Sequence, residues 1–303
     1  MPFECFVSKR FIGRNGELIE QANSIIAEYQ DQGFVLTLRQ LYYQFVARAL
    51  IPNTMQSYKR LGQVINDARL AGLVDWDALE DRTRNVQQVA MWGSPEDILR
   101  DDASVFRITR WDDQPCHVEV WIEKDALTGV IERVCNEHLV PFFACRGYTS
   151  QSEQWRAGKR FARLMEMGKR VVVLHLGDHD PSGIDMTRDT IDRLAMFAGE
   201  EVEVRRLALN IEQVRRFSPP PNPAKETDSR CNGYVRRFGD KSWELDALDP
   251  RVIDGLIRMQ LDELIDRERW RDAITREDVA RHQLRETANR WDEVAEFLDQ
   301  AEP

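Results

Sequence analysis

The 303-residue sequence lacks long apolar runs, paired cysteines and a nucleotide-binding loop. No stretch reaches the roughly 20 apolar residues of a membrane-spanning helix, and the N-terminus lacks the apolar core of a secretory signal. The five cysteines are scattered and form no CxxC pair, and histidines are few, so we expect neither a zinc site nor a disulfide framework. Without a GxxxxGKS/T loop, ATP binding is not expected. We expect a cytoplasmic protein with reduced thiols and no membrane partner.

Charge is distributed unevenly along the chain. The 52 acidic and 42 basic side chains give a formal net charge of −10, which argues against nucleic acid as a partner of the chain as a whole. Residues 241–303, however, hold seventeen acidic and ten basic side chains. Residues 34–72 hold one acid and five basic residues, which are Arg39, Arg48, Lys59, Arg60 and Arg69. Because phosphate contact needs only a local positive field, a DNA-binding surface near the N-terminus is compatible with the acidic total.

Residues 1–94 are expected to form a mainly helical DNA-binding domain. Apolar residues at helical spacing predict three short helices, at 14–31, 38–50 and 56–72. Thr37 is a favourable N-cap for the second of them. Residues 73–86 are expected to form an extended wing. Three short helices followed by a wing are typical of a winged helix-turn-helix, with the third helix as the DNA-reading element; an ordinary helical bundle is the alternative.

The pattern changes after residues 95–115, which we expect to be a linker. Strand-like runs then alternate with amphipathic helical stretches, the strands at 117–122, 139–145, 170–177 and 201–209 and the helices at 125–138, 151–168 and 183–198. This alternation predicts βαβ units and an α/β domain with a parallel, Rossmann-like sheet over residues 116–265. Residues 218–240, rich in Pro, Asn and Gly, are expected to form a long loop, and residues 266–303 an acidic helical tail.

Carboxylates follow two of the predicted strands. Asp178 and Asp180 lie in GDHDPSG, between an apolar strand and a helix, and Glu123 follows the first strand. Since parallel strands open on one side of the sheet, these side chains are expected to meet at one edge. Their hard oxygens suit Mg²⁺, so we predict a magnesium site. The alternatives are an Asp-rich turn and a glutamate that favours a helix N-terminus; Lys124 is either surface charge or a phosphate contact.

Four stretches give the chain a resemblance to a known family. WIEKDA at 121–126 and LGDHDPSG at 176–183 resemble the Toprim domain. ELDAL at 244–248 resembles the segment that follows the acidic site in topoisomerase VI A subunits. TLRQLYYQFV at 37–46 resembles the R-x-x-Y-Y motif in the winged-helix domain of those subunits and of the meiotic double-strand-break proteins. The order of the two domains also matches that family.

The resemblance implies a Mg²⁺-dependent enzyme that cleaves double-stranded DNA. It implies that Glu123, Asp178 and Asp180 bind the metal and that Glu123 is catalytic. It also implies that Tyr43 attacks DNA to form a 5′-phosphotyrosyl link, with Arg39 as a phosphate contact. From the residues alone, Tyr43 is also compatible with a helix core, because a phenol with a pKa of about 10 needs a cation such as Arg39 to become a nucleophile.

The resemblance also predicts partners. In the family the tyrosine of one subunit meets the acidic site of another, which predicts a homodimer, and a separate B-type subunit supplies the ATPase. The present chain is short for an A subunit. A bacterial or archaeal version is expected to be nucleoid-associated. The alternatives are a hydrolytic Toprim nuclease of a defence or mobile-element system, without a tyrosine intermediate, and a non-catalytic DNA-binding scaffold.

Candidate DNA contacts come from both halves of the chain. Lys225 and Arg230 follow a rigid PPPNP run, so they are expected either to hold DNA phosphates or to belong to a solvated loop. The full set of expected DNA contacts is Arg48, Lys59, Arg60, Arg69, Lys124, Lys225 and Arg230.

Overall fold

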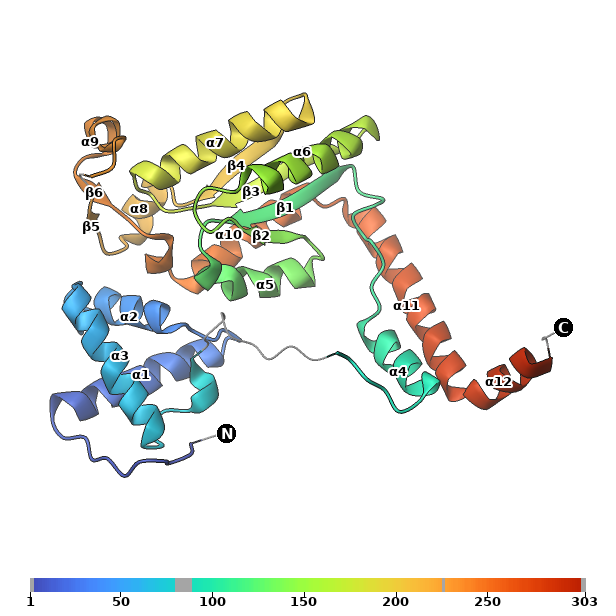
Figure 1. Cartoon of the computed structure of the whole chain (residues 1–303), viewed down its shortest axis with the longest axis horizontal. Coiled ribbons are helices and arrows are strands. Elements are labelled where there is room, and N and C mark those ends of the chain that lie inside the picture. The colour runs from blue at the N-terminus through green and yellow to red at the C-terminus, as the bar shows by residue number, and fades with distance from the viewer. Residues whose placement is uncertain (1–2, 80–88, 225–226, 301–303) are drawn as a thin grey trace.

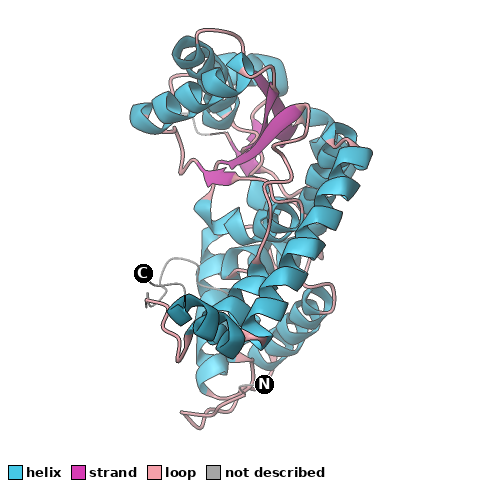
Figure 2. Cartoon of the chain, turned by 90° about the vertical axis from the view of Figure 1, so that its right-hand side faces the viewer, coloured by secondary structure: helices cyan, strands magenta, loops and turns pink. Residues whose placement is uncertain are grey.

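The computed structural model describes residues 3–79, 89–224 and 227–300. These residues form an N-terminal helical part and an α/β part that follows it (Figure 1). In the turned view of Figure 2 the strands gather at one end of the molecule. The α/β class expected from alternating strands and helices is therefore confirmed. Within the described ranges, no helix combines the length and apolarity needed to cross a membrane.

The N-terminal part contains three helices close to the predicted positions, α1 (Arg14–Gln30), α2 (Leu38–Ala47) and α3 (Met55–Leu70). Thr37 caps α2 as expected. Its hydroxyl accepts the backbone N–H of Gln40, and the Gln40 side chain accepts the backbone N–H of Thr37. The apolar faces of the helices close on one core that includes Ile25, Phe45 and Ile65.

The segment expected to form a wing begins with a single 3₁₀ turn, η1 (Trp76–Ala78). Leu79 then makes an isolated parallel bridge with Leu36. Residues 80–86 of the expected wing lie outside the described residues. Arg69 holds the turn, because its guanidinium lies 4.9 Å from the Trp76 ring centroid and also donates to the Trp76 carbonyl. The charge of Arg69, an expected DNA contact, is therefore used within the chain.

The α/β part is built on a parallel four-stranded sheet in the order β2–β1–β3–β4. Its strands are β1 (Cys116–Ile122), β2 (Phe142–Ala144), β3 (Arg170–Leu176) and β4 (Glu203–Ala208). One face is covered by α5 (Thr128–Glu137) and α10 (Pro250–Leu264), and the other by α6 (Gln151–Glu166) and α7 (Pro181–Ala198) (Figure 1). Because the strand order reverses between β1 and β3, a crevice opens where these two strands end.

Short elements surround that end of the sheet. They are η2 (Asp125–Leu127), α8 (Ile211–Phe217), β5 (Asn222–Pro223), α9 (Cys231–Phe238), β6 (Lys241–Ser242) and η3 (Leu245–Ala247). Residues 218–240, expected to be one long loop, therefore contain a helix and a strand. Strand β5 pairs antiparallel with β6, and Tyr234 of α9 is buried. Packing of this kind stabilises a helix too short to form alone.

The expected linker at 95–115 also contains a helix, α4 (Pro95–Val105). The Ser94 hydroxyl accepts the backbone N–H of Asp97 and so caps the N-terminus of α4. Helix α4 packs along α11 (Arg267–Asn289), which is followed by α12 (Trp291–Gln300) (Figure 1). Glu277 of α11, 1% exposed, accepts the backbone N–H of Ile108 at 3.2 Å and pairs with Arg110 at 2.8 Å. Buried ionic contacts therefore fix the residues that join the two parts.

The N-terminal helices contact the α/β part beside the end of the sheet. The Tyr29 hydroxyl donates to the Asp249 carboxylate at 2.8 Å. The Asn53 amide donates to the Pro221 carbonyl at 3.1 Å. Ala247 of η3 packs into the core of the N-terminal helices. These contacts bring α2 and α3 to the crevice at the ends of β1 and β3.

Candidate functional site

Glu123 and Asp178 meet at the crevice, as their positions after β1 and β3 predict. The Glu123 carboxylate accepts the backbone N–H of Asp178 at 2.8 Å, and both side chains are buried. Burial raises the pKa of both carboxyl groups, although the Lys124 ammonium acts in the opposite direction on each. The Asp180 carboxylate adds to the rise at Glu123, and the Glu123 carboxylate adds to the rise at Asp178. This buried acidic environment favours the binding of positive charge.

Two glycines of GDHDPSG permit this close approach. A Cβ on Gly177 would lie 2.9 Å from the Glu123 carboxylate, and a Cβ on Gly183 would lie 2.2 Å from the Asp178 carbonyl oxygen. Neither position tolerates a side chain without movement of its neighbour. The glycines of the motif therefore serve the packing of the acidic residues.

Asp180 acts first as the N-cap of α7. One carboxylate oxygen accepts the backbone N–H of Gly183 at 2.7 Å and the hydroxyl of Ser182 at 3.0 Å. Its carboxylate is also close enough to Glu123 to raise the pKa of that residue. The structure thus gives Asp180 a capping role and keeps it near the other two acids.

Lys124 is the centre of the site's electrostatics. Its ammonium nitrogen lies 3.0 Å from carboxylate oxygens of Asp178, Glu244 and Asp246. Burial lowers the pKa of Lys124, but these three carboxylates outweigh burial and raise it above its usual value. Lys124 is therefore neither a free surface charge nor an open phosphate contact in this arrangement.

Glu244 and Asp246 are site residues that the sequence pattern did not assign. Their signal was present, because both lie in the ELDAL stretch that carries part of the family resemblance. Arg39 of α2 also pairs with Glu244, and it lies 3.2 Å from Asp246. Burial raises the pKa of Glu244, but Lys124 and Arg39 outweigh it and lower the pKa below its usual value. The 244–248 stretch thus links α2 to the end of the sheet.

The expected magnesium ligands do not fit a divalent ion in this arrangement. Over residues 3–79, 89–224 and 227–300, no group of three or more His, Cys, Asp or Glu side chains is placed to hold a metal. One oxygen of Asp178 accepts the backbone N–H of Leu245 at 2.8 Å, and the other pairs with Lys124. A shared metal would require Lys124 to leave Asp178.

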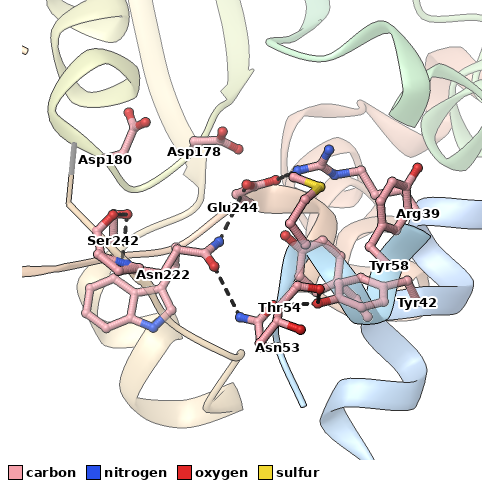
Figure 3. Close-up of a pocket in the computed structure, with 14 residues that line it drawn as sticks. Arg39, Tyr42, Asn53, Thr54, Tyr58, Asp178, Asp180, Asn222, Ser242 and Glu244 are labelled. Carbon is pink, nitrogen blue, oxygen red and sulfur yellow. Dashed lines mark hydrogen bonds and ion pairs between the residues drawn. The ribbon is translucent and has the colours of Figure 1, made fainter. Parts of the chain in front are cut away.

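A cavity of about 280 Å³ lies between the N-terminal helices and the end of the sheet. Figure 3 shows Arg39 of α2 and Asp178 and Asp180 of the sheet edge on its wall. Glu244 lies between the two sides, and the Asn53 amide donates to the Asn222 side-chain oxygen at 3.1 Å. Residues far apart in the sequence therefore form one polar chamber.

Tyr43 lines the same cavity but is only 3% exposed. Burial and the Glu244 carboxylate raise its pKa to about 12, although Arg39 and a hydrogen bond with Asn222 act in the opposite direction. The guanidinium carbon of Arg39 lies 5.9 Å from the Tyr43 ring centroid. Tyr43 therefore lies near its expected cation, Arg39, and shares the cavity with Asp178 and Asp180 of the same chain. Its hydroxyl is protonated at neutral pH.

His179, between the two aspartates, is held in an aromatic enclosure. Its ring nitrogen Nδ1 lies 2.7 Å from the Tyr234 hydroxyl, and its ring packs edge-to-face against Phe238 and Trp243. Backbone hydrogen bonds of 2.8 and 2.9 Å join His179 to Trp243. Burial lowers the pKa of His179 to about 4, so the ring is neutral and positions the acidic loop against α9 and β6.

Two of the expected DNA contacts near the N-terminus have partners within the chain. Arg48 pairs with Glu28 at 2.7 Å, and Arg60 donates to the Asn15 side chain at 3.1 Å. Lys59 is exposed on α3. Fewer basic side chains near the N-terminus are therefore available for DNA than the sequence count suggests.

The expected DNA contacts of the 218–240 segment differ from each other. Arg230 pairs with Asp228 at 2.8 Å and with Asp185 at 3.0 Å, so its charge is largely balanced. Lys225 lies outside the described residues.

The comparisons with known proteins identify no family for this chain. No protein-family model, curated protein or solved structure matches the chain. A functional assignment therefore depends on the chemistry of the chamber itself.

Proposed function

We propose that this chain cleaves DNA through a tyrosine intermediate, as a topoisomerase VI A-like protein with a winged-helix part (1–94) and a Toprim part (116–265). The observation that carries the proposal is that Tyr43, Arg39 and Asp178 line one cavity. A phenol, cations and buried acids are groups that phosphodiester transfer uses. Double-stranded DNA, a homodimer and a separate ATPase subunit are the proposed partners.

Each side chain has a role in this proposal. Tyr43 is the nucleophile. Arg39 and Lys124 exchange their carboxylate partners for the phosphate oxygens and neutralise the charge that develops there. Glu123 accepts the Asp178 N–H and so keeps the acidic loop beside the phosphate. Until DNA binds, carboxylates such as Glu244 hold Arg39 and Lys124 in place.

The chemical step conserves atoms and charge. The Tyr43 oxygen forms a bond to phosphorus as its proton passes to solvent. The bond between phosphorus and the 3′ oxygen breaks, and that oxygen keeps the electron pair and takes a proton from solvent. The products are a 5′-phosphotyrosyl end and a free 3′-hydroxyl end.

The described arrangement corresponds to the resting enzyme in this proposal. Tyr43 is buried and its pKa is about 12, so attack requires the phosphate to draw Arg39 towards the phenol and away from Glu244. No step is assigned to Mg²⁺, because its expected ligands Glu123, Asp178 and Asp180 do not fit an ion here. Lys124 would have to move away from Asp178 before these carboxylates could bind an ion.

The deciding experiment compares Tyr43→Phe with the wild type on supercoiled plasmid, in a buffer that contains Mg²⁺. Covalent protein on 5′ ends is measured after denaturation. We expect the variant to lose the adduct and to slow cleavage by about 10³-fold or more. Tyr148→Phe is the matched control, because it removes a phenol hydroxyl outside the chamber and should leave the adduct yield unchanged.

The burial of Tyr43 favours a second candidate, a hydrolytic nuclease in which water attacks the phosphate. The Tyr43 phenol is 3% exposed and protonated, and both properties are also typical of a tyrosine with a purely structural role. In that case Tyr43→Phe would still cut DNA without ever forming an adduct, whereas Glu123→Ala would abolish cutting. If the wild type binds DNA and never cuts it, both enzymatic proposals fail and a DNA-binding scaffold is left.

A further inference from the structure

The same four residues, Val-Arg-Arg-Phe, end two short helices beside the chamber. They are residues 214–217 at the end of α8 and residues 235–238 at the end of α9. In both helices the arginines are the basic residues of the last turn. Since cations are favourable at a helix C-terminus, the position suits the arginines without requiring an internal partner.

The packing directs both arginine pairs outwards. Val214 of α8 and Tyr234 of α9 are buried, so each helix has one inner face. Arg215, Arg216, Arg236 and Arg237 are all exposed. Arg216 and Arg237 lie 5.1 and 5.0 Å from the ring centroids of the phenylalanines that follow them. Flat aromatic support of this kind extends a guanidinium towards solvent while leaving its donors available.

The four arginines differ from most other arginines near the site. In the part of the chain that the structure describes, none of the four forms an ion pair with a carboxylate, whereas Arg39 and Arg230 do. Residues 211–241 hold seven basic and four acidic side chains in a chain whose net charge is −10. The four exposed arginines thus concentrate positive charge locally on an acidic protein, the distribution that phosphate binding needs.

The chain connections limit how far both arginine pairs can lie from the chamber. Residues 218–221 join α8 to β5, residues 239–240 join α9 to β6, and β5 pairs with β6 through Asn222 and Ser242. At about 3.6 Å per extended residue, Arg216 and Arg237 lie within roughly 22 Å of this strand pair. Figure 1 shows α8, α9, β5 and β6 at the same end of the molecule. Asn222 and Ser242 themselves line the cavity.

Helix α9 is also connected to the acidic loop by direct contact. The Tyr234 hydroxyl lies 2.7 Å from His179 Nδ1 and donates to the His179 carbonyl at 2.8 Å. Arg236 and Arg237 follow Tyr234 on the same short helix. A ligand that holds α9 would therefore also hold the loop that carries Asp178 and Asp180.

We propose that Arg215, Arg216, Arg236 and Arg237 form the surface that binds the phosphate backbone of DNA next to the chamber. The inference deepens the proposed function and rests on it. It moves the main DNA contact away from the N-terminal basic residues, several of which are paired internally, to the two Val-Arg-Arg-Phe helices. The contact reads phosphates and not bases, because exposed helix ends carry charge without a groove-filling element.

The experiment measures how the affinity for a short DNA duplex depends on salt, in the wild type and in a variant that changes all four arginines to alanine. Each phosphate contact contributes about 0.9 to the slope of log K against log salt, so the slope should become shallower by about 3 to 4. Circular dichroism checks that the variant is folded. The double variants Arg215→Ala, Arg216→Ala and Arg236→Ala, Arg237→Ala should each account for about half of the change.

The matched control is Arg163→Ala, Arg271→Ala, which removes exposed arginines of α6 and α11 and should leave the slope unchanged. An unchanged slope in the quadruple variant overturns the inference. The inference is also overturned if the wild type does not bind DNA but binds an acidic polypeptide or vesicles that contain an anionic lipid.

These outcomes are separable from failure of the proposed chemistry, which is read from the 5′ adduct. A shallower slope in the variant, with no adduct from the wild type, would keep the DNA surface and reject tyrosine cleavage. An adduct from the wild type with an unchanged slope in the variant would keep tyrosine cleavage and reject the surface.

Discussion

The ammonium nitrogen of Lys124 lies 3.0 Å from the carboxylate of Asp178, the residue expected to hold a metal ion. The same nitrogen is equally close to Glu244 and Asp246. A lysine thus supplies, from within the chain, the positive charge that the acidic crevice requires. Stability, ionisation and substrate entry at this site should all depend on that one cation.

Replacement of the lysine by an apolar side chain, Lys124→Met, should destabilise the protein by about 3 kcal/mol at neutral pH, since it leaves the buried Asp178 carboxylate without its cation and Glu244 and Asp246 with Arg39 alone. Those carboxylates take up protons at low pH, so the loss should be smaller at about pH 5 than at about pH 8. Urea unfolding at both values measures it. Lys159→Met, an exposed residue of α6, is the control. An equal loss at both pH values would contradict the arrangement.

The ionisation of Tyr43 should respond to Glu244. The Glu244 carboxylate helps to raise the pKa of Tyr43 to about 12. Glu244→Gln removes a negative charge beside the phenolate, so the pKa of Tyr43 should fall below that value. Tyrosinate absorbance, compared with the same variant that also carries Tyr43→Phe, isolates this residue. Glu132→Gln, on the exposed side of α5, should change nothing.

Gly183, in the first turn of α7, should be far less replaceable than another helical glycine. A Cβ at residue 183 would lie 2.2 Å from the Asp178 carbonyl oxygen, so Gly183→Ala should cost about 3 kcal/mol of unfolding free energy and displace the acidic loop. Gly255→Ala in α10 meets nothing within 4 Å, and it should stabilise the protein by up to about 1 kcal/mol. Chemical denaturation distinguishes the two, and equal effects would refute the packing described.

Glu277 should control the attachment of α4. Burial raises the pKa of Glu277, but Arg110 and the backbone N–H of Ile108 lower it below its usual value. Its contribution to stability is therefore present above the ordinary glutamate pKa and is lost as pH falls through the lower value in the folded protein. Glu277→Gln should quicken amide exchange in α4 by about 10- to 100-fold at neutral pH. The N-terminal helices serve as the internal reference, because their exchange should not change.

Local patterns predicted the elements that surround the site. The apolar runs of β1 and β3 predicted strands, and the N-cap Thr37 predicted a helix, at nearly the observed positions. The rule that parallel strands open on one side brought Glu123 to Asp178. These features depend on residues close in sequence or on strand direction, which a single sequence records.

Features that depend on distant partners were not predictable in the same way. The charge of Lys124 gave no sign that it would join residues more than one hundred positions away, such as Glu244. Helix α9 is short and contains a glycine, and it depends on the contact of Tyr234 with His179. Helix α4 was recognisable in principle, because Ser94 followed by Pro95 is a helix start; the expectation of a linker outweighed that signal.

One consequence concerns the number of copies that the chemistry needs. Tyr43 and Asp178 border a single cavity within one polypeptide, so each protomer carries both halves of the proposed reaction. Mixing protomers that carry Tyr43→Phe with protomers that carry Glu123→Ala should then fail to restore cutting. A lone protomer would nick one strand, and a paired break would require two complete protomers acting on opposite strands.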